Sequence, residues 1–130
     1  MKETILVVDD EKEICIILSD NLSQEGYRVL TAHNGKMALQ LVRKEKPDLI
    51  LLDIKMPGMD GIEALSRVKK MNKEIAVIML TAYGTLETAR KAMKLGAYDY
   101  ITKPFDLFFL KSLVKEALGK LSKQARRGQR

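Results

Sequence analysis

Carboxylates follow two apolar runs of the sequence, and both runs are typical of buried strands. Asp9 and Asp10 follow residues 4–8, and Asp53 follows residues 49–52. Strands that are covered on both faces read as continuous apolar runs, which is the habit of parallel sheets in α/β domains. In open α/β sheets, ligands bind at the carboxyl ends of strands. The three acids therefore mark a candidate site.

Three carboxylates in one crevice need a compensating charge. Two like charges about 4 Å apart repel by about 4 kcal/mol at an effective dielectric near 20. Such a site is tolerable if a carboxylate is protonated or a cation binds. With one cysteine, Cys15, and one histidine, His33, a zinc site built from N and S ligands is excluded. Oxygen ligands favour Mg²⁺, with Mn²⁺ as an alternative.

Two more polar residues follow apolar runs of the same kind. Thr81 closes residues 75–80, and Lys103 follows residues 98–101. On a parallel sheet, both side chains reach the same rim as the acids. A carboxylate nucleophile, a divalent ion, a hydroxyl donor and a cation are the groups needed for phosphoryl transfer to Asp53. The product would be an aspartyl-phosphate.

Each of these residues also has a simpler explanation. Asp10 fits the N-cap of a helix with Glu13 completing a capping box, and Asp60 fits an N-cap as well. Thr81 fits an ordinary β-branched strand residue, and Lys103 fits a solvated lysine. The convergence of four strand ends on one crevice favours the chemical interpretation.

The apolar pattern predicts five β-α units in strict alternation. Strands are expected at residues 4–8, 27–31, 49–52, 75–80 and 98–101, and the helices between and after them at 14–22, 37–42, 60–68, 86–95 and 107–121. This predicts an α/β fold, a doubly wound, flavodoxin-like parallel sheet of five strands. The half-polar second and fifth strands suit the edges, which gives the order 2-1-3-4-5 with a crevice between the first and third strands.

The positive charge of the chain is concentrated at its end. The 130 residues carry a net charge of +6. The cations after residue 118 are Lys120, Lys123, Arg126, Arg127 and Arg130. We therefore expect one domain over residues 1–121 and a basic tail, or the start of a linker, over 122–130. The body has no basic stripe for nucleic acid and no apolar stretch of about 20 residues for a membrane. The single cysteine fits a reducing, cytoplasmic compartment.

Four motifs together resemble the response-regulator receiver domain of bacterial two-component signalling: residues 7–11 (VVDDE), 52–61 (LDIKMPGMDG), 80–82 (LTA) and 100–105 (YITKPF). The resemblance covers about residues 3–121. Residues 81–100 resemble receivers of NtrC-type transcription activators more than motor-binding ones. The resemblance implies a phosphorylation-activated switch that accepts a phosphoryl group on Asp53 from a sensor histidine kinase or a phosphotransfer protein.

The resemblance also implies residue roles. Mg²⁺ would be held by Asp10, Asp53 and the backbone carbonyl of Lys55, with Asp9 acting through water. Thr81 and Lys103 would contact the phosphoryl group.

Two further roles concern the switch and its geometry. Tyr100 would change rotamer when Thr81 shifts, and the peptide bond between Lys103 and Pro104 would be cis.

A pair of aromatic residues suggests a partner surface. Phe108 and Phe109 fall off the apolar stripe of the last helix, where receivers often have acidic residues. Exposed aromatics are typical of contact surfaces. We expect a surface on residues 86–95, 98–101 and 107–121 that binds a partner or forms a homodimer, with no direct nucleic-acid or membrane contact.

Two alternatives use the same residues differently. A phosphohydrolase of the haloacid-dehalogenase kind normally has a second acid two residues after the nucleophile, where this sequence has Lys55. A degenerate receiver would act only as a protein-interaction domain, against which the complete acidic set argues. We therefore expect a signalling phosphoacceptor that catalyses only its own Mg²⁺-dependent phosphorylation and dephosphorylation, and not an enzyme acting on other substrates.

Overall fold

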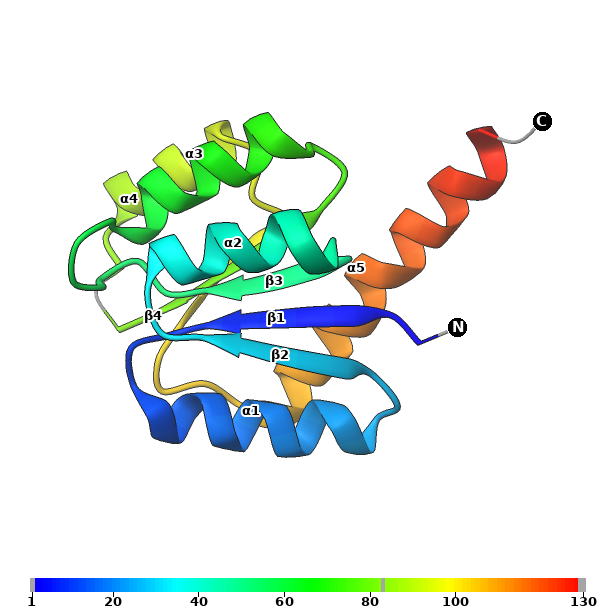
Figure 1. The fold of residues 1–130 in the computed structure, drawn as a ribbon, viewed down its shortest axis with the longest axis horizontal. Coiled ribbons are helices and arrows are strands. Elements are labelled where there is room, and N and C mark those ends of the chain that lie inside the picture. Colours follow the sequence, from blue (N-terminus) through cyan, green and yellow to red (C-terminus); the bar gives the residue numbers. More distant parts are fainter. Residues whose placement is uncertain (1, 83, 129–130) are drawn as a thin grey trace.

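Five parallel strands form one sheet with helices on both faces (Figure 1). The computed structural model describes residues 2–82 and 84–128, with side chains described as far as residue 119. The elements in chain order are β1 (Thr4–Val8), α1 (Lys12–Gln24), β2 (Arg28–Ala32), α2 (Gly35–Glu45), β3 (Leu49–Leu52), α3 (Gly61–Met71), β4 (Ala76–Thr81), α4 (Leu86–Lys94), β5 (Asp99–Thr102) and α5 (Leu107–Gly128). The strand order β2-β1-β3-β4-β5 confirms the prediction.

Alternate residues of the buried strands supply two separate cores. Leu6, Ile50 and Val77 pack with α2, α3 and α4 on one face. Ile5 and Leu51 pack with α1 and α5 on the other face. Successive side chains of a strand point to opposite faces, so strands β1, β3 and β4 must be apolar at every position. Their carboxyl ends meet at one edge of the sheet (Figure 1).

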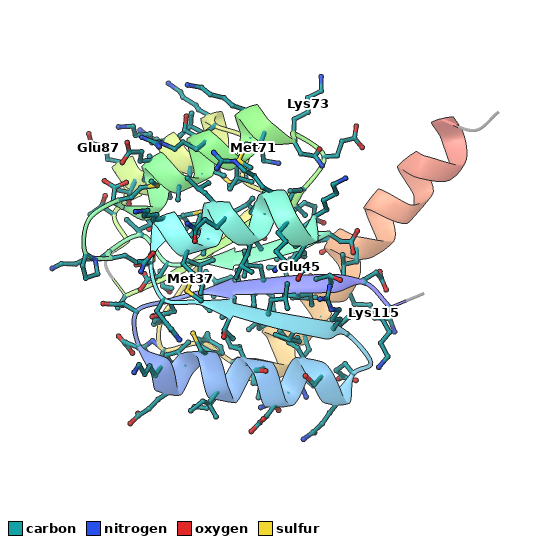
Figure 2. The ribbon with its side chains drawn as sticks, in the orientation of Figure 1. Met37, Glu45, Met71, Lys73, Glu87 and Lys115 are labelled. Atoms are coloured by element: carbon teal, nitrogen blue, oxygen red, sulfur yellow. The ribbon has the colours of Figure 1, made fainter. Side chains whose placement is uncertain are left out.

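Charged side chains cover the outer surfaces of the helices. Glu87 of α4 and Lys73, in the loop after α3, are exposed and project from the body in Figure 2, and Lys115 of α5 is exposed as well. Among the described residues, no helix is both long enough and apolar enough to cross a membrane.

The helix starts agree in part with the sequence. Asp60 is the N-cap of α3, and its side chain accepts a hydrogen bond from the Glu63 amide at 2.9 Å, as predicted. The simpler explanation of Asp10 as the N-cap of α1 is wrong. The N-cap is Glu11, for which the described structure gives no side-chain capping bond. The carboxylate of Asp10 is therefore not used by the helix.

The element bounds differ slightly from those predicted. Strands β2, β4 and β5 begin and end one residue later than their apolar runs suggested. Helix α5 continues to Gly128, beyond the apolar stripe that ends at Leu121. Residues 122–128 thus extend α5, and their use as a tail or linker stays a prediction.

Candidate functional site

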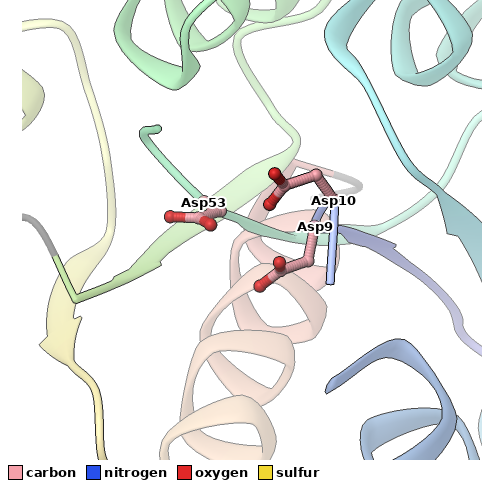
Figure 3. Close-up of side chains that lie close together, drawn as sticks. All are labelled: Asp9, Asp10 and Asp53. Carbon is pink, nitrogen blue, oxygen red and sulfur yellow. The ribbon is translucent and has the colours of Figure 1, made fainter. Parts of the chain in front are cut away.

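The three predicted acids converge at the carboxyl ends of β1 and β3. One carboxylate oxygen from each of Asp9, Asp10 and Asp53 lies within 4.8 Å of those of the other two, as Figure 3 illustrates. Backbone hydrogen bonds continue the sheet to this point. The Asp53 amide donates to the Val8 carbonyl at 3.0 Å, and the Asp9 amide donates to the Ala32 carbonyl at 3.1 Å. The strand register therefore fixes Asp9 and Asp53 relative to one another.

Lys103 reaches into this cluster from the end of β5. Its Nζ lies 2.6 Å from Asp9 Oδ2 and 3.4 Å from Asp53 Oδ2, and the lysine side chain is only 10% exposed. Burial by itself would lower the pKa of Lys103, but the hydrogen bond to Asp9 and the charges of Asp9 and Asp53 raise it overall. The interpretation of Lys103 as a solvated lysine is wrong.

One cation does not neutralise the site. Burial raises the pKa of Asp9 despite the opposing hydrogen bond from Lys103, and the charge of Asp53 raises it further. The buried Oδ1 of Asp53 has no hydrogen-bond partner among the described residues. A buried polar atom without a partner costs about 1–3 kcal/mol. An excess of negative charge and an unused carboxylate oxygen fit a small divalent cation.

Thr81 completes the rim at the end of β4. The residue is fully buried and pairs in register with Thr102 of β5. Its carbonyl accepts a hydrogen bond from the Lys103 amide at 2.9 Å, which connects the ends of the two strands.

The Lys103–Pro104 peptide bond is cis. Lys55 lies in the loop after Asp53 with its side chain exposed, and its carbonyl stays a predicted ligand.

Tyr100 connects β5 to the start of α4. Its hydroxyl lies 3.2 Å from Oγ1 of Thr88. Thr88 forms a reciprocal capping box with Thr85 at the N-terminus of α4. The ring also packs against Gly84, where an added Cβ would meet Tyr100 Cε1 at 2.8 Å. The predicted switch aromatic therefore contacts the loop that follows Thr81.

Gly61 lets the start of α3 approach Asp53 closely. Its amide donates to the Ile54 carbonyl at 2.6 Å. A Cβ at this position would collide with the Asp53 carbonyl oxygen and would lie 2.6 Å from Ile54 Cα. Only glycine fits without displacing the backbone of the acidic loop.

Phe108 and Phe109 are exposed, by 80% and 54%. Phe108 lines a groove of about 390 Å³ with Tyr27 and Lys111, between the end of α1 and α5. Since α1 and α5 share one face of the sheet, Phe108 lies on the α1 side of α5. At 100° per residue, Phe109 falls on the opposite flank. The two rings therefore lie on different flanks of α5, and the partner surface on α4, β5 and α5 stays a prediction.

The sequence analysis missed the contact between Cys15 and His33. Cys15 Sγ lies 3.8 Å from His33 Nδ1, and both atoms approach the Asp9 carbonyl oxygen. Cys15 is a buried core residue, with 2% exposure. The predicted strand order contained a signal for this contact. When the first two strands pair in parallel with Val8 opposite Ala32, the next residues along them, Asp9 and His33, lie side by side.

Comparison with known proteins supports one family. The response regulator receiver domain model matches residues 5–115. Sporulation initiation phosphotransferase F of Bacillus subtilis (strain 168) is 48% identical over 91% of this chain and 95% of its own length. Transcriptional regulatory protein ZraR of Klebsiella oxytoca is also 48% identical, over 88% of this chain but only 26% of ZraR. The second match is consistent with the predicted likeness to NtrC-type receivers.

Solved structures give the same result. A CheY-like response regulator receiver domain protein from Methanospirillum hungatei JF-1 superposes with a TM-score of 0.93, at 34% identity, over 95% of this chain and 99% of that one. The sequence motifs, the strand order, the acidic cluster and these matches agree. This chain belongs to the family of response regulator receiver domains.

Proposed function

We propose that this chain is a phosphorylation-activated switch in which Asp53 accepts a phosphoryl group in a Mg²⁺-dependent reaction. The observation that carries the proposal is the pairing of Lys103 with both Asp9 and Asp53, while Asp53 Oδ1 has no partner among the described residues. The site thus presents one available carboxylate oxygen, beside a fixed cation. Family membership supports the same role.

The transfer needs few protein groups. A carboxylate oxygen of Asp53 attacks the phosphorus of a phosphohistidine, the new P–O bond forms, and the P–N bond to the donor breaks. The Lys103 ammonium would weaken its ion pairs with Asp9 and Asp53 and contact one phosphoryl oxygen. The Thr81 hydroxyl would donate a hydrogen bond to another phosphoryl oxygen. Charge stabilisation and positioning contribute most of the catalysis in phosphoryl transfer.

A divalent ion would occupy the acidic cluster. Asp10, Asp53 and the Lys55 carbonyl would hold it, and Asp9 would act through water. When bound, it supplies positive charge to the transferring phosphoryl group.

The phosphodonor is proposed to be a protein that docks beside Lys103. An apolar groove of about 550 Å³ borders the site, and it is lined by Ile14, Ile17, Pro104 and Leu107 as well as Lys103. A protein donor that reaches Asp53 would contact this groove. A kinase or phosphotransfer protein with an apolar contact surface fits the groove.

Phosphorylation is proposed to act on α4 through Thr81 and Tyr100. Movement of Thr81 toward the phosphoryl group would shift the loop that follows Thr81. This loop includes Gly84, which the Tyr100 ring contacts. Tyr100 would then change its position against Thr88, and the α4-β5-α5 surface would change with it. This surface would control a partner, an output domain or a homodimer.

The decisive experiment is incubation with acetyl phosphate with and without Mg²⁺, followed by intact mass measurement. The chain should gain one phosphate only with Mg²⁺, and Asp53→Asn should gain none. The matched control is Asp20→Asn, which neutralises an exposed acid on α1 outside the site. This variant should behave as the unaltered chain. Absence of both Mg²⁺ binding and phosphorylation would instead support a degenerate receiver. Sustained turnover of a small phosphate ester would support a phosphohydrolase.

A further inference from the structure

The Asp9 carbonyl oxygen receives hydrogen bonds from two side chains that the proposed chemistry does not use. His33 Nδ1 lies 3.3 Å from this oxygen, and Cys15 Sγ lies 3.5 Å from it. These are the one histidine and the one cysteine of the chain. His33 follows β2, and Cys15 is in the second turn of α1. Two separate elements therefore meet at one peptide group beside the acidic cluster.

Both contacts use a proton on the side chain, because a carbonyl oxygen only accepts hydrogen bonds. Cys15 donates from S–H, and His33 donates in the tautomer that carries its proton on Nδ1. Burial raises the pKa of the Cys15 thiol to about 11, and the charge of Asp9 contributes. The thiol therefore keeps its proton at neutral pH and remains a donor.

This peptide group sets the direction in which the chain leaves β1. The Asp9 amide is fixed by the Ala32 carbonyl at 3.1 Å, and Asp9 Oδ1 accepts from the Glu11 amide at 2.9 Å. The Asp9 carbonyl belongs to the peptide that connects Asp9 to Asp10. Fixing that carbonyl fixes the plane of the peptide and with it the position from which the Asp10 side chain starts.

The N-cap of the helix that follows does not supply this restraint. Glu11 is the N-cap of α1 and makes no side-chain capping bond in the described structure. Asp10 itself is exposed. The orientation of the Asp10 carboxylate relative to Asp53 thus depends on the turn at residues 9–11.

We propose that His33 and Cys15 are positioning residues that orient the Asp9–Asp10 peptide so that both carboxylates face a divalent cation. This inference rests on the proposed function, because it concerns the same cation. Neither side chain touches the cation or the phosphoryl group. Their contribution is to reduce the conformational freedom of the acidic turn before the ion binds.

The expected effect is on Mg²⁺ affinity. Loss of an outer partner of a metal site costs about 10–100-fold in metal affinity or activity. His33 contacts the backbone beside the metal ligands and not a ligand atom itself. We therefore expect an effect at the lower end of this range, about tenfold weaker Mg²⁺ binding for His33→Ala. Cys15→Ala should act in the same direction with a smaller effect, since thiols are weak donors.

Isosteric variants separate positioning from general stability. The side-chain amide of Asn places a donor where histidine has Nδ1, whereas Gln places it where histidine has Nε2. His33→Asn should therefore restore Mg²⁺ affinity, and His33→Gln should not. Ser19→Ala is the matched control, because Ser19 lines the same groove of about 300 Å³ as Cys15 and His33.

The test is a Mg²⁺ titration of each variant followed by the NMR shifts of the Asp10 and Asp53 amides, together with thermal unfolding in EDTA. The inference is supported if affinity falls for His33→Ala and returns for His33→Asn while unfolding in EDTA is unchanged. Mg²⁺ affinities equal to that of the unaltered chain, or affinity losses that follow the unfolding temperature without rescue, overturn it. If the unaltered chain itself does not respond to Mg²⁺, the proposed function fails as well.

Discussion

The Asp53 side chain is only 4% exposed and carries a negative charge beside two others. One of its oxygens has no hydrogen-bond partner in the part of the chain that the structure describes. A residue in such surroundings reduces the stability of the folded chain in exchange for reactivity. The cost and the reactivity arise from the same feature, so they are expected to disappear together when the charge is removed.

Asp53→Asn is expected to stabilise the protein in EDTA. Removal of one buried like charge leaves Lys103 paired with Asp9, and a gain of about 1 kcal/mol corresponds to an increase in unfolding temperature of a few degrees. Circular dichroism melting with and without Mg²⁺ measures this. Mg²⁺ should stabilise the unaltered chain more than the variant, because a ligand of the native state stabilises it according to its affinity and the variant lacks one carboxylate. A variant that melts lower in EDTA would contradict the expectation.

Cys15 should react slowly with thiol reagents. Its pKa of about 11 exceeds the ordinary value of 9.0, so the thiolate fraction at pH 8 is about 100-fold smaller than for a free thiol, and 2% exposure limits access further. The rate of reaction with a disulfide reagent measures this, and addition of denaturant should restore a normal rate. Equal rates in the folded and denatured chain would show that the thiol is not protected.

At the scale of elements, glycine and capping residues decide how helices approach the site. Helix α3 approaches the Asp53 loop only because Gly61 lacks a side chain. Helix α4 begins at a capping box that also contacts Tyr100. The N-terminus of α3 is therefore positioned by a close backbone contact, and the N-terminus of α4 is positioned by side-chain hydrogen bonds.

Gly61→Ala is expected to destabilise the chain by about 1–3 kcal/mol, the usual cost of overpacking, and to slow phosphorylation because the Asp53 backbone must shift. Gly119→Ala is the matched control. An added Cβ there meets nothing within 4 Å, and replacement of a helical glycine by alanine typically stabilises by about 0.5–1 kcal/mol. Urea denaturation of the two variants should therefore give opposite signs.

Thr88 and Tyr100 are expected to be energetically coupled. A double-mutant cycle of Thr88→Val and Tyr100→Phe should give an interaction energy of about 0.5–1.5 kcal/mol, the value of a typical hydrogen bond. Hydrogen exchange of the α4 amides provides the measurement, and Thr88→Ser, which keeps the hydroxyl, is the control. Additive effects would mean that the contact of 3.2 Å carries no energy.

At the scale of the whole molecule, the flanks of α5 present different surfaces. Phe109→Glu should weaken self-association or partner binding after phosphorylation, because Phe109 is on the flank toward β5. Phe108→Glu should have a smaller effect, since its ring borders the α1 groove. Sedimentation equilibrium with acetyl phosphate and Mg²⁺ compares them. If both variants associate like the unaltered chain, the surface lies elsewhere.

Most of the fold could be predicted because its signals are local. The apolar runs of β1, β3 and β4 and the half-polar runs of β2 and β5 determine which strands are central. The acids were predicted because each follows such a run. The contact of His33 with the Asp9 carbonyl could not be predicted from residue type alone, because a single histidine forms no motif with its neighbours in the sequence. The contact becomes apparent once the register of β1 and β2 places His33 beside Asp9. The direction of Phe108 depends on how α5 packs, which the helical period alone does not determine.

Helix α5 leads away from the acidic edge toward the opposite end of the molecule (Figure 1). A dye, an affinity label or a surface tether joined to that end would leave the carboxylates open to solution. Immobilised chains should therefore be accessible to small phosphodonors and to large ones alike, which makes this end suitable for attachment in binding measurements.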